Sequence, residues 1–228
     1  MAVQFAQPFR FTEQQVARMA EAGLIHRDET RLIDGVPYRA GAPIRFSRAA
    51  YYRLGEMGVL TKRDRVELID GEIIEMSPIS PRHSACVSRL ARLLTPRVGS
   101  ALVRFENPLA LPDEYDPQPD VVVVRARDDD YEESHPTSDE ALLVVEVADS
   151  SLRYDRTVKV QRYADAGLPE YWLVDLTRNE VIVYQDPIAG EYRNARTYGL
   201  GESWTSMAIP GLVVSANMIL KRRSQETL

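Results

Sequence analysis

Two short stretches decide the fold: Pro119-Asp120-Val121-Val122-Val123-Val124 and Leu142-Leu143-Val144-Val145-Glu146-Val147. Each is a run of apolar, mostly β-branched residues that carries one carboxylate near an end. Runs of this length, bounded by proline or charge, are typical of strands buried on both faces, as the central strands of an α/β sheet are. Because a lone carboxylate costs several kcal/mol to bury, we expect Asp120 and Glu146 to be paired, hydrogen-bonded or bound to a cation.

The composition is that of an ordinary globular protein. The chain has 228 residues, of which 44% are hydrophobic and 27% charged, and this is long enough to bury a full core. No apolar run approaches the roughly 20 residues that span a bilayer, and the first ten residues lack the pattern of a secretory signal. The single cysteine, Cys86, excludes an internal disulfide and a cysteine-rich zinc site. We therefore expect a cytoplasmic protein with no membrane partner.

The formal net charge of -6 comes from one segment. Residues 128–140 contain seven acidic residues and no Lys or Arg, so removing them leaves the rest of the chain at +1. This segment joins the two key strands and is interpreted as a solvated loop. Its acidity is local, so the charge excludes neither an acidic nor a basic partner.

The N-terminal quarter contains a weak internal duplication. Each copy has a Thr or Ser N-cap, an amphipathic helix closed by glycine, and two strands joined by an Asp-Gly turn. The matched positions are 11–12, 22–25 and 32–35 in the first copy and 46–47, 57–60 and 68–71 in the second. Because a solenoid needs at least three stacked units, the first copy is interpreted as an extension packed beside the second. Only the second copy has a carboxylate, Glu67, where the first has Arg31.

A helix is predicted to begin at Ser80. This serine is the expected N-cap, and Pro81 suits the first helical position. Apolar residues then recur at helical spacing as far as Leu94. His83 is expected in the first turn of this helix, where free N–H groups and the helix dipole favour anions.

A second helix is predicted over residues 154–166, after the Glu146 strand. Asp155, Lys159 and Tyr163 are spaced at i, i+4 and i+8, so they share one face of it. An amine on that face reaches the strand ends if the face points at the rim of the sheet. Further strands are predicted at 102–105, 170–175, 181–184 and 192–198, with a closing segment at 209–214.

These motifs together resemble the Uma-type family of restriction endonucleases, which belongs to the PD-(D/E)XK nuclease superfamily. The matching positions are Pro119-Asp120, Glu146-Val147, Asp155, Lys159, Tyr163 and residues 167–175, with residues 67–72, 76–78 and His83 upstream. The resemblance extends from about Phe46 to Leu220. It implies an α/β (α+β) fold in which a mixed β-sheet is flanked by helices. It also divides the chain into an N-terminal extension (1–45), a nuclease-like domain (46–220) and a basic tail (221–228).

The resemblance implies cleavage of DNA with a divalent metal, usually Mg²⁺, for which Mn²⁺ can substitute. Carried over by position, Asp120 and Glu146 are the metal-binding acids, and the carbonyl of Val147 is a further candidate ligand. The sequence departs from the short form of the superfamily motif, because Ala148 stands two residues after Glu146 where that form has lysine. Members of the family supply this lysine from the following helix, where Lys159 stands here.

The chemistry of these residue types agrees with that function. Carboxylate oxygens suit a hard cation, and magnesium held by one or two carboxylates polarises a phosphate and activates a water. An ammonium group nearby stabilises the negative charge that develops during hydrolysis. Together with the positions that match the family, this makes Asp120, Glu146, Lys159, Glu67, His83 and Asp155 the catalytic candidates.

Plainer structural interpretations stand beside these. Lys159 and Asp155 can form an ion pair on a solvated helix face, worth about 0.3 to 0.5 kcal/mol. His83 can be a capping or core histidine, and Glu67 an exposed residue of an edge strand. Tyr171 and Trp172 are assigned to the core.

Two other functions remain open. One is a catalytically inactive module that keeps the nuclease fold and binds nucleic acid or a protein partner. The other is a nuclease that acts on RNA or on an unusual DNA structure. We expect a homodimer, because two sites cut both strands of a duplex most simply.

Overall fold

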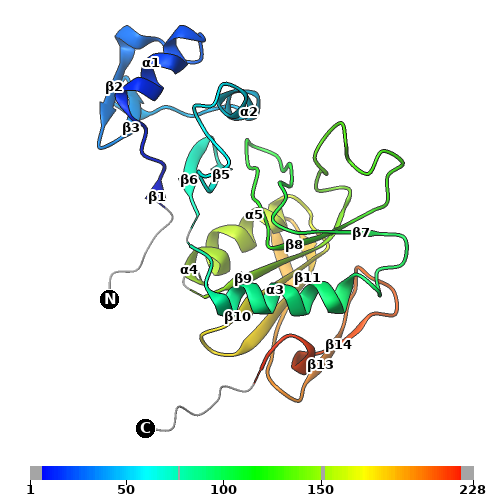
Figure 1. The fold of residues 1–228 in the computed structure, drawn as a ribbon. Coiled ribbons are helices and arrows are strands. Elements are labelled where there is room, and N and C mark those ends of the chain that lie inside the picture. The colour runs from blue at the N-terminus through cyan, green and yellow to red at the C-terminus, as the bar shows by residue number, and fades with distance from the viewer. Residues whose placement is uncertain (1–6, 77, 150–151, 222–228) are drawn as a thin grey trace, which may run out of the picture. The chain divides into compact units, whose positions relative to one another are not determined.

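The computed structural model describes residues 7–76, 78–149 and 152–221 (Figure 1). The chain forms two compact units. The first combines Met1–Ser77 with Ala110–Pro117, and the second combines Pro78–Leu109 with Gln118–Leu228. The first unit therefore includes a short segment from the middle of the chain, the excursion at residues 110–117. Each unit is described by itself below.

The first unit contains the two copies of the duplicated segment. Its first copy consists of α1 (Glu13–Glu21), η1 (Arg27–Glu29), β2 (Thr30–Ile33), β3 (Val36–Arg39) and β4 (Ala42–Pro43). Its second copy consists of α2 (Arg48–Glu56), β5 (Val66–Ile69) and β6 (Glu72–Glu75), with β1 (Gln7–Pro8) paired to β6. Both copies thus form the predicted helix followed by a hairpin.

Equivalent residues of the two copies make equivalent contacts. The amide of Phe11 donates to the carbonyl of Gly35, and the amide of Phe46 donates to the carbonyl of Gly71, both at 2.7 Å. Both glycines have positive φ, and a Cβ on Gly35 would lie 2.7 Å from the Cβ of Arg10. These Asp-Gly turns therefore need glycine, both for its conformation and for close approach of the chain.

The two copies share one hydrophobic core, which includes Phe11, Met19, Phe46 and Leu54. The predicted boundary between residues 45 and 46 consequently separates the two copies, while the compact unit continues to Ser77. The proposed division into an extension and a nuclease-like domain stays a prediction. Of the predicted basic tail, residues 222–228 lie outside the described residues.

The second unit is built on a six-stranded mixed sheet with the strand order β12-β11-β10-β9-β8-β7. Its strands are β7 (Leu102–Arg104), β8 (Val121–Val124), β9 (Ala141–Ala148), β10 (Glu170–Asp175), β11 (Glu180–Ile188) and β12 (Glu191–Tyr198). Only β9 and β10 pair in parallel, and the remaining neighbours are antiparallel. All four valines of β8 are fully buried, so the predicted central strand is confirmed.

Helices cover both faces of this sheet (Figure 1). The long helix α3 (Pro81–Leu94) packs against Val121, Val145 and their neighbours, and Ser80 is its N-cap as predicted. The small hairpin of β13 (Ser203–Thr205) and β14 (Val213–Ser215), with η3 (Ala216–Met218), completes the core on this face. The other face is covered by α4 (Leu152–Tyr154), η2 (Asp155–Lys159) and α5 (Val160–Asp165). The predicted mixed sheet flanked by helices is therefore confirmed.

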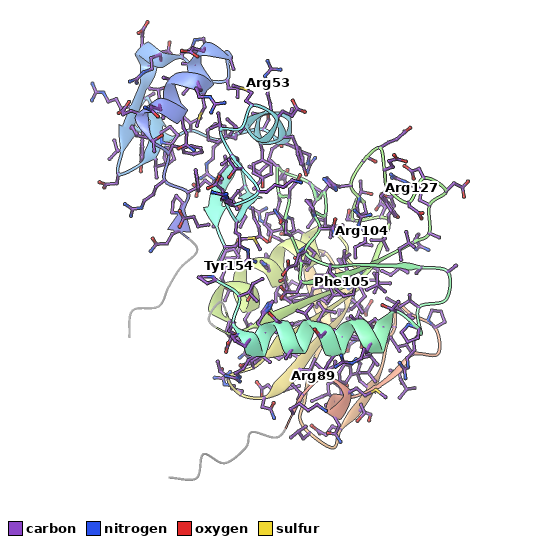
Figure 2. All side chains as sticks on the ribbon, viewed as in Figure 1. Arg53, Arg89, Arg104, Phe105, Arg127 and Tyr154 are labelled. Atoms are coloured by element: carbon purple, nitrogen blue, oxygen red, sulfur yellow. The ribbon has the colours of Figure 1, made fainter. Side chains whose placement is uncertain are left out.

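The acidic segment after β8 is a loop, as expected, and five of its seven acidic residues are exposed. Arg127 binds Asp129 and Glu140 and lies over the ring of Tyr131, 4.0 Å from its centroid. Arg104 lies over the same ring, 5.5 Å from its centroid. Figure 2 labels both arginines. Arg127 and Arg104 come from outside the acidic run, and their contacts with the buried Tyr131 fasten the loop at that residue. None of the helices in the described part of the chain is long and apolar enough to cross a membrane.

Candidate active site

The register of β8 and β9 brings the two predicted metal-binding acids together. Val121 lies opposite Val145 in this antiparallel pair, and one further step places Asp120 opposite Glu146. Directly opposed residues of such a pair have their Cα atoms about 4.5 to 5.5 Å apart. The amide of Val147 donates to Asp120 Oδ2 at 2.6 Å, which fixes the Asp120 carboxylate beside β9. Residues 26 positions apart in sequence thus meet at one end of the central strands.

The first turn of α3 supplies His83 to this place. His83 Nε2 lies 2.9 Å from Asp120 Oδ1, and both side chains are 13% exposed. The Ser80 hydroxyl accepts a hydrogen bond from the His83 amide at 3.1 Å and donates one to Asp149 Oδ2 at 2.6 Å. Asp149 directly follows β9, so the capping serine ties the start of α3 to the end of that strand.

Glu146 lies on the opposite face of the sheet from α3 and receives two donors at one oxygen. Lys159 Nζ lies 2.9 Å from Glu146 Oε1, and the Tyr163 hydroxyl donates to the same atom at 2.8 Å. Lys159 Nζ is also 3.6 Å from Asp155 Oδ1. The predicted face of Asp155, Lys159 and Tyr163 therefore points at the sheet, and all three side chains are buried.

The segment that carries Asp155 and Lys159 is a single stretch of π-helix, η2, between α4 and α5. Such wider turns are rare and occur frequently at functional sites. The sequence predicted one continuous α-helix over residues 154–166. The structure corrects this by the insertion of η2, which ends where Val160 begins α5.

Negative charge is in excess around these residues. Asp120, Glu146 and Asp155 contribute three carboxylates, and Lys159 contributes one ammonium group. Burial, and then the charges of Asp155 and Glu146, raise the pKa of Tyr171 well above its ordinary value. This tyrosine remains a neutral phenol, and its hydroxyl lies 3.3 Å from the Asp155 carbonyl.

The donor chemistry of Asp120 and Glu146 fits magnesium. Both supply hard oxygen ligands, and this ion is usually held by one or two carboxylates while it keeps several waters. A divalent cation would also balance the excess of negative charge in a buried place. Within the described residues, no group of three or more His, Cys, Asp or Glu side chains is arranged to hold a metal. The pair predicted from the sequence, Asp120 and Glu146, would therefore need water to complete the coordination.

A sequence profile of the Uma2 family, described as "Putative restriction endonuclease", matches residues 49–217. The chain belongs to this family. Among solved structures, it is similar to a crystal structure described as "a putative nuclease belonging to DUF820" from Anabaena variabilis. The two are 18% identical with a TM-score of 0.58, and the match covers 78% of this chain and 97% of the other. A search of curated proteins finds no match. The resemblance seen in the sequence is confirmed, and the structural likeness supports the fold.

Two of the plainer interpretations are wrong. Lys159 and Asp155 are 6% and 3% exposed, so they do not form an ion pair on a solvated helix face. Glu67 is 5% exposed within β5 of the first unit, so it is not a solvated edge residue. The catalytic roles of Lys159, Asp155, Glu67 and His83 remain predictions for this member of the Uma2 family.

Three residues outside the predicted set complete the surroundings of the acids. Tyr163 was placed on the correct helix face by its spacing from Lys159, yet it was not expected to bind Glu146. Ser80 was expected only as a cap, and no pattern pointed to Asp149. Cys86 lies one turn beyond His83 on α3, and burial raises the pKa of its thiol to about 11. This thiol stays protonated near neutral pH, so Cys86 is not a nucleophile.

Proposed function

We propose that this Uma2-family protein is a metal-dependent DNA endonuclease that hydrolyses phosphodiester bonds, with Mg²⁺ held by Asp120 and Glu146. One observation carries the proposal: the strand register sets these acids opposite each other while Lys159 binds Glu146 at 2.9 Å. Membership of a family described as "Putative restriction endonuclease" supports a nuclease. The buried excess of carboxylates supports a cation.

When bound, the metal ion supplies Lewis-acid polarisation of the phosphate and lowers the pKa of water. The protein's own groups position the reactants. The Lys159 ammonium lies against Glu146, from which it stabilises negative charge on a phosphate oxygen that enters beside this carboxylate. Asp155 Oδ1 lies 3.6 Å from the same ammonium.

Two neighbours orient the acids. His83 binds one oxygen of Asp120 while the Val147 amide binds the other, so the carboxylate is held at both ends. The Tyr163 hydroxyl donates to Glu146. Hydrogen bonds of this kind, from residues around a metal site to its ligands, orient those ligands. His83 and Tyr163 are therefore positioning residues in this proposal.

The test is cleavage of supercoiled plasmid and of single-stranded DNA, with and without magnesium. Asp120→Asn and Glu146→Gln are expected to lower the rate at least about a hundredfold, because each replaces a charged ligand with a neutral amide of similar shape. Glu191→Gln, at an exposed position of β12, is the matched control and is expected to cleave like the wild type. Full magnesium-dependent activity in both site variants would refute the proposal.

A second candidate is a catalytically inactive module that uses the same fold to bind nucleic acid or a protein. It is favoured by one observation, the ion pair in which Lys159 already neutralises Glu146. Titration with Mn²⁺ separates the two, since an inactive fold need not bind the ion through Asp120 and Glu146. An RNA substrate in the same assay separates DNA from RNA cleavage.

The assembly is part of the proposal. A homodimer provides one site for each strand of a duplex, with magnesium or manganese in each. Sedimentation of the purified protein with and without duplex DNA measures this directly. A monomer that cuts both strands would contradict the dimer and leave the nuclease proposal in place.

A further inference from the structure

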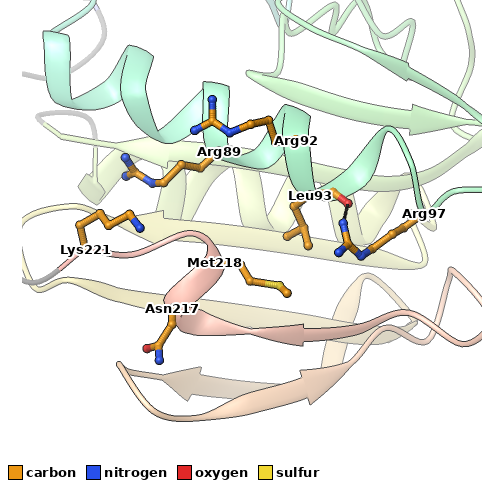
Figure 3. A pocket seen from close by; sticks show the side chains of 7 residues that line it. All are labelled: Arg89, Arg92, Leu93, Arg97, Asn217, Met218 and Lys221. Atoms are coloured by element: carbon orange, nitrogen blue, oxygen red, sulfur yellow. Dashed lines mark hydrogen bonds between the residues drawn. The ribbon is translucent and has the colours of Figure 1, made fainter.

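A second charged region lies on α3, away from Asp120 and Glu146. It is a pocket of about 260 Å³ between the C-terminal half of α3 and the segment around η3 (Figure 3). Four cationic side chains line it, together with Asn217 and two apolar residues, and the lining contains no carboxylate. The four are Arg89, Arg92, Arg97 and Lys221.

The charge of this pocket is unusual for an acidic protein. Between Glu75 and Glu106 the sequence contains five arginines and no acidic residue, while the whole chain has a net charge of -6. Three of these arginines line the pocket. Gathering like charges costs free energy through mutual repulsion, and a bound anion relieves that cost.

Backbone contacts hold two of the guanidinium groups in place. Arg89 donates through Nε to the carbonyl of Ile219. This bond does not use the four N–H groups of the two terminal nitrogens. Arg97 donates through one terminal nitrogen to the carbonyl of Leu93 at 2.9 Å. Arg92 and Lys221 are exposed and make no hydrogen bond or ion pair within the described part of the chain.

We propose that this pocket binds phosphate groups. Arginine guanidinium groups match phosphate oxygens in pairs of parallel hydrogen bonds, and a lysine adds a point charge. The volume of about 260 Å³ is below the roughly 300 to 1,000 Å³ of pockets that enclose whole small molecules, so it suits a charged group. That group comes either from a nucleic-acid strand or from a free phosphate.

The phosphate bound here is not the one that is cleaved. Arg92 is nine residues from His83 on the same helix, which is about 14 Å along the axis and half a turn around it. His83 faces Asp120, so Arg92 points away from the candidate active site. Loss of the pocket should therefore weaken binding and leave the rate of the bound complex unchanged.

The plainer interpretation is that cations near the end of α3 only offset the helix dipole. Arg97 does so, because it binds a carbonyl of the last turn. Arg92 and Lys221 make no such contact with the described residues, and they distinguish the two interpretations. Their replacement changes anion binding if the pocket is a site, and changes helix stability alone if it is not.

The experiment compares the full-length wild type with Arg92→Gln/Lys221→Gln. The control is Arg193→Gln/Arg196→Gln, which removes the same charge from exposed positions of β12. One arm measures fluorescence anisotropy of labelled single- and double-stranded DNA in EDTA, so that cleavage does not interfere. The other arm titrates inorganic phosphate by calorimetry. Thermal unfolding of all three proteins checks the fold.

Strand phosphates are the ligand if the pocket variant alone binds DNA more weakly. The wild type then makes two more phosphate contacts than the variant, so its affinity for DNA should be the more sensitive to salt. Between about 50 and 200 mM salt, its affinity should fall by about tenfold more than that of the variant. A free phosphate is the ligand if only the calorimetric response disappears. Binding equal to that of the control in both arms, or no binding by the wild type in either, overturns the pocket proposal.

The result is separable from the proposed nuclease function. A pocket variant that binds and cleaves like the wild type overturns the pocket alone. A wild type that binds phosphate through the pocket and shows no magnesium-dependent cleavage overturns the nuclease proposal alone. At saturating DNA, the single-turnover rate of the pocket variant should equal that of the wild type.

Discussion

The two ends of α3 adjoin regions of opposite charge, one acidic and one basic. At its first turn, His83 contacts Asp120, and the neighbouring strand carries the buried Glu146, whose carboxylate shares the Lys159 ammonium with Asp155. Toward its C-terminus, four cations surround an open pocket in which Arg92 and Lys221 are exposed. The first region is closed by protein partners, and the second is available to solvent.

The difference shows what each region suits. A buried excess of negative charge is stable only with a compensating positive charge, so the acidic region favours a small, tightly held cation. Exposed cations need no partner for stability, so the basic pocket favours a ligand that exchanges with solvent. Five predictions sharpen or break this contrast.

Lys159→Met should have the largest effect on stability. Without the ammonium, Glu146 and Asp155 face each other in a buried place, and we expect a loss of about 3 to 5 kcal/mol in the free energy of unfolding. Arg92→Met removes a cation from the exposed pocket and should change stability by less than about 0.5 kcal/mol. Urea denaturation measures both. A small effect of Lys159→Met would show that the acidic region is not closed to water.

Magnesium should partly restore Lys159→Met. A bound ion stabilises the folded state according to its concentration relative to its dissociation constant, and the variant leaves Glu146 with less competition for it. Urea titrations with and without Mg²⁺ measure the gain. Lys159→Met/Glu146→Gln is the control and should show no gain.

Tyr163→Phe should have an intermediate effect. It removes a hydrogen bond to a charged, buried group, worth about 1.5 to 3 kcal/mol. Cleavage should fall while the affinity for nucleic acid remains, since the basic pocket is untouched. Tyr192→Phe, whose hydroxyl donates to the Leu168 carbonyl, is the matched control with a similar structural cost.

Ser80→Ala should have a smaller effect, with a clear internal reference. Loss of an N-cap costs about 1 kcal/mol, both here and in Ser47→Ala at the start of α2. Only Ser80 also holds Asp149 and the His83 amide, so only Ser80→Ala should slow cleavage. Equal cleavage by the two variants would remove Ser80 from the positioning of His83.

Cys86, on α3 between the two regions, should give the smallest effect. Burial raises the pKa of its thiol to about 11, with Arg89 lowering it and Asp120 raising it. The ordinary value is about 8.5, so this group contributes stability below that pH and loses it as the pH rises toward 11. Stability of the wild type and Cys86→Ala between pH 8 and 10.5 measures this loss, and alkylation of the wild type should be slow throughout.

Features set by local chemistry were predictable from the sequence. The buried valines of β8, the Ser80-Pro81 helix start and the two Asp-Gly turns depend on residues close together in the chain. The meeting of Asp120 and Glu146 was also expected, because both acids stand at the ends of strands that read as neighbours. Their catalytic roles stay predictions.

Features set by distant contacts were not predictable in the same way. The hydrogen bond from Arg89 to Ile219 joins residues 130 positions apart, so no spacing pattern in the sequence predicts the basic pocket. In the π-helical segment, Lys159 contacts both Asp155 and Glu146, whereas helical periodicity alone gives an ordinary α-helix. Likewise, Asp149 acquires its role only when α3 packs beside the end of β9.

The excursion at residues 110–117 has a consequence for how the protein is made. Asp116 accepts from Arg48 at 2.6 Å, and its amide donates to the Leu68 carbonyl at 2.8 Å, so these late residues finish the first unit. During synthesis, that unit stays incomplete until residue 117 has been added, directly before the residues of β8. A chain cut after residue 77 would lack residues 110–117, and a chain that began at residue 78 would carry them without the rest of their unit, so neither unit is separable by a single cut.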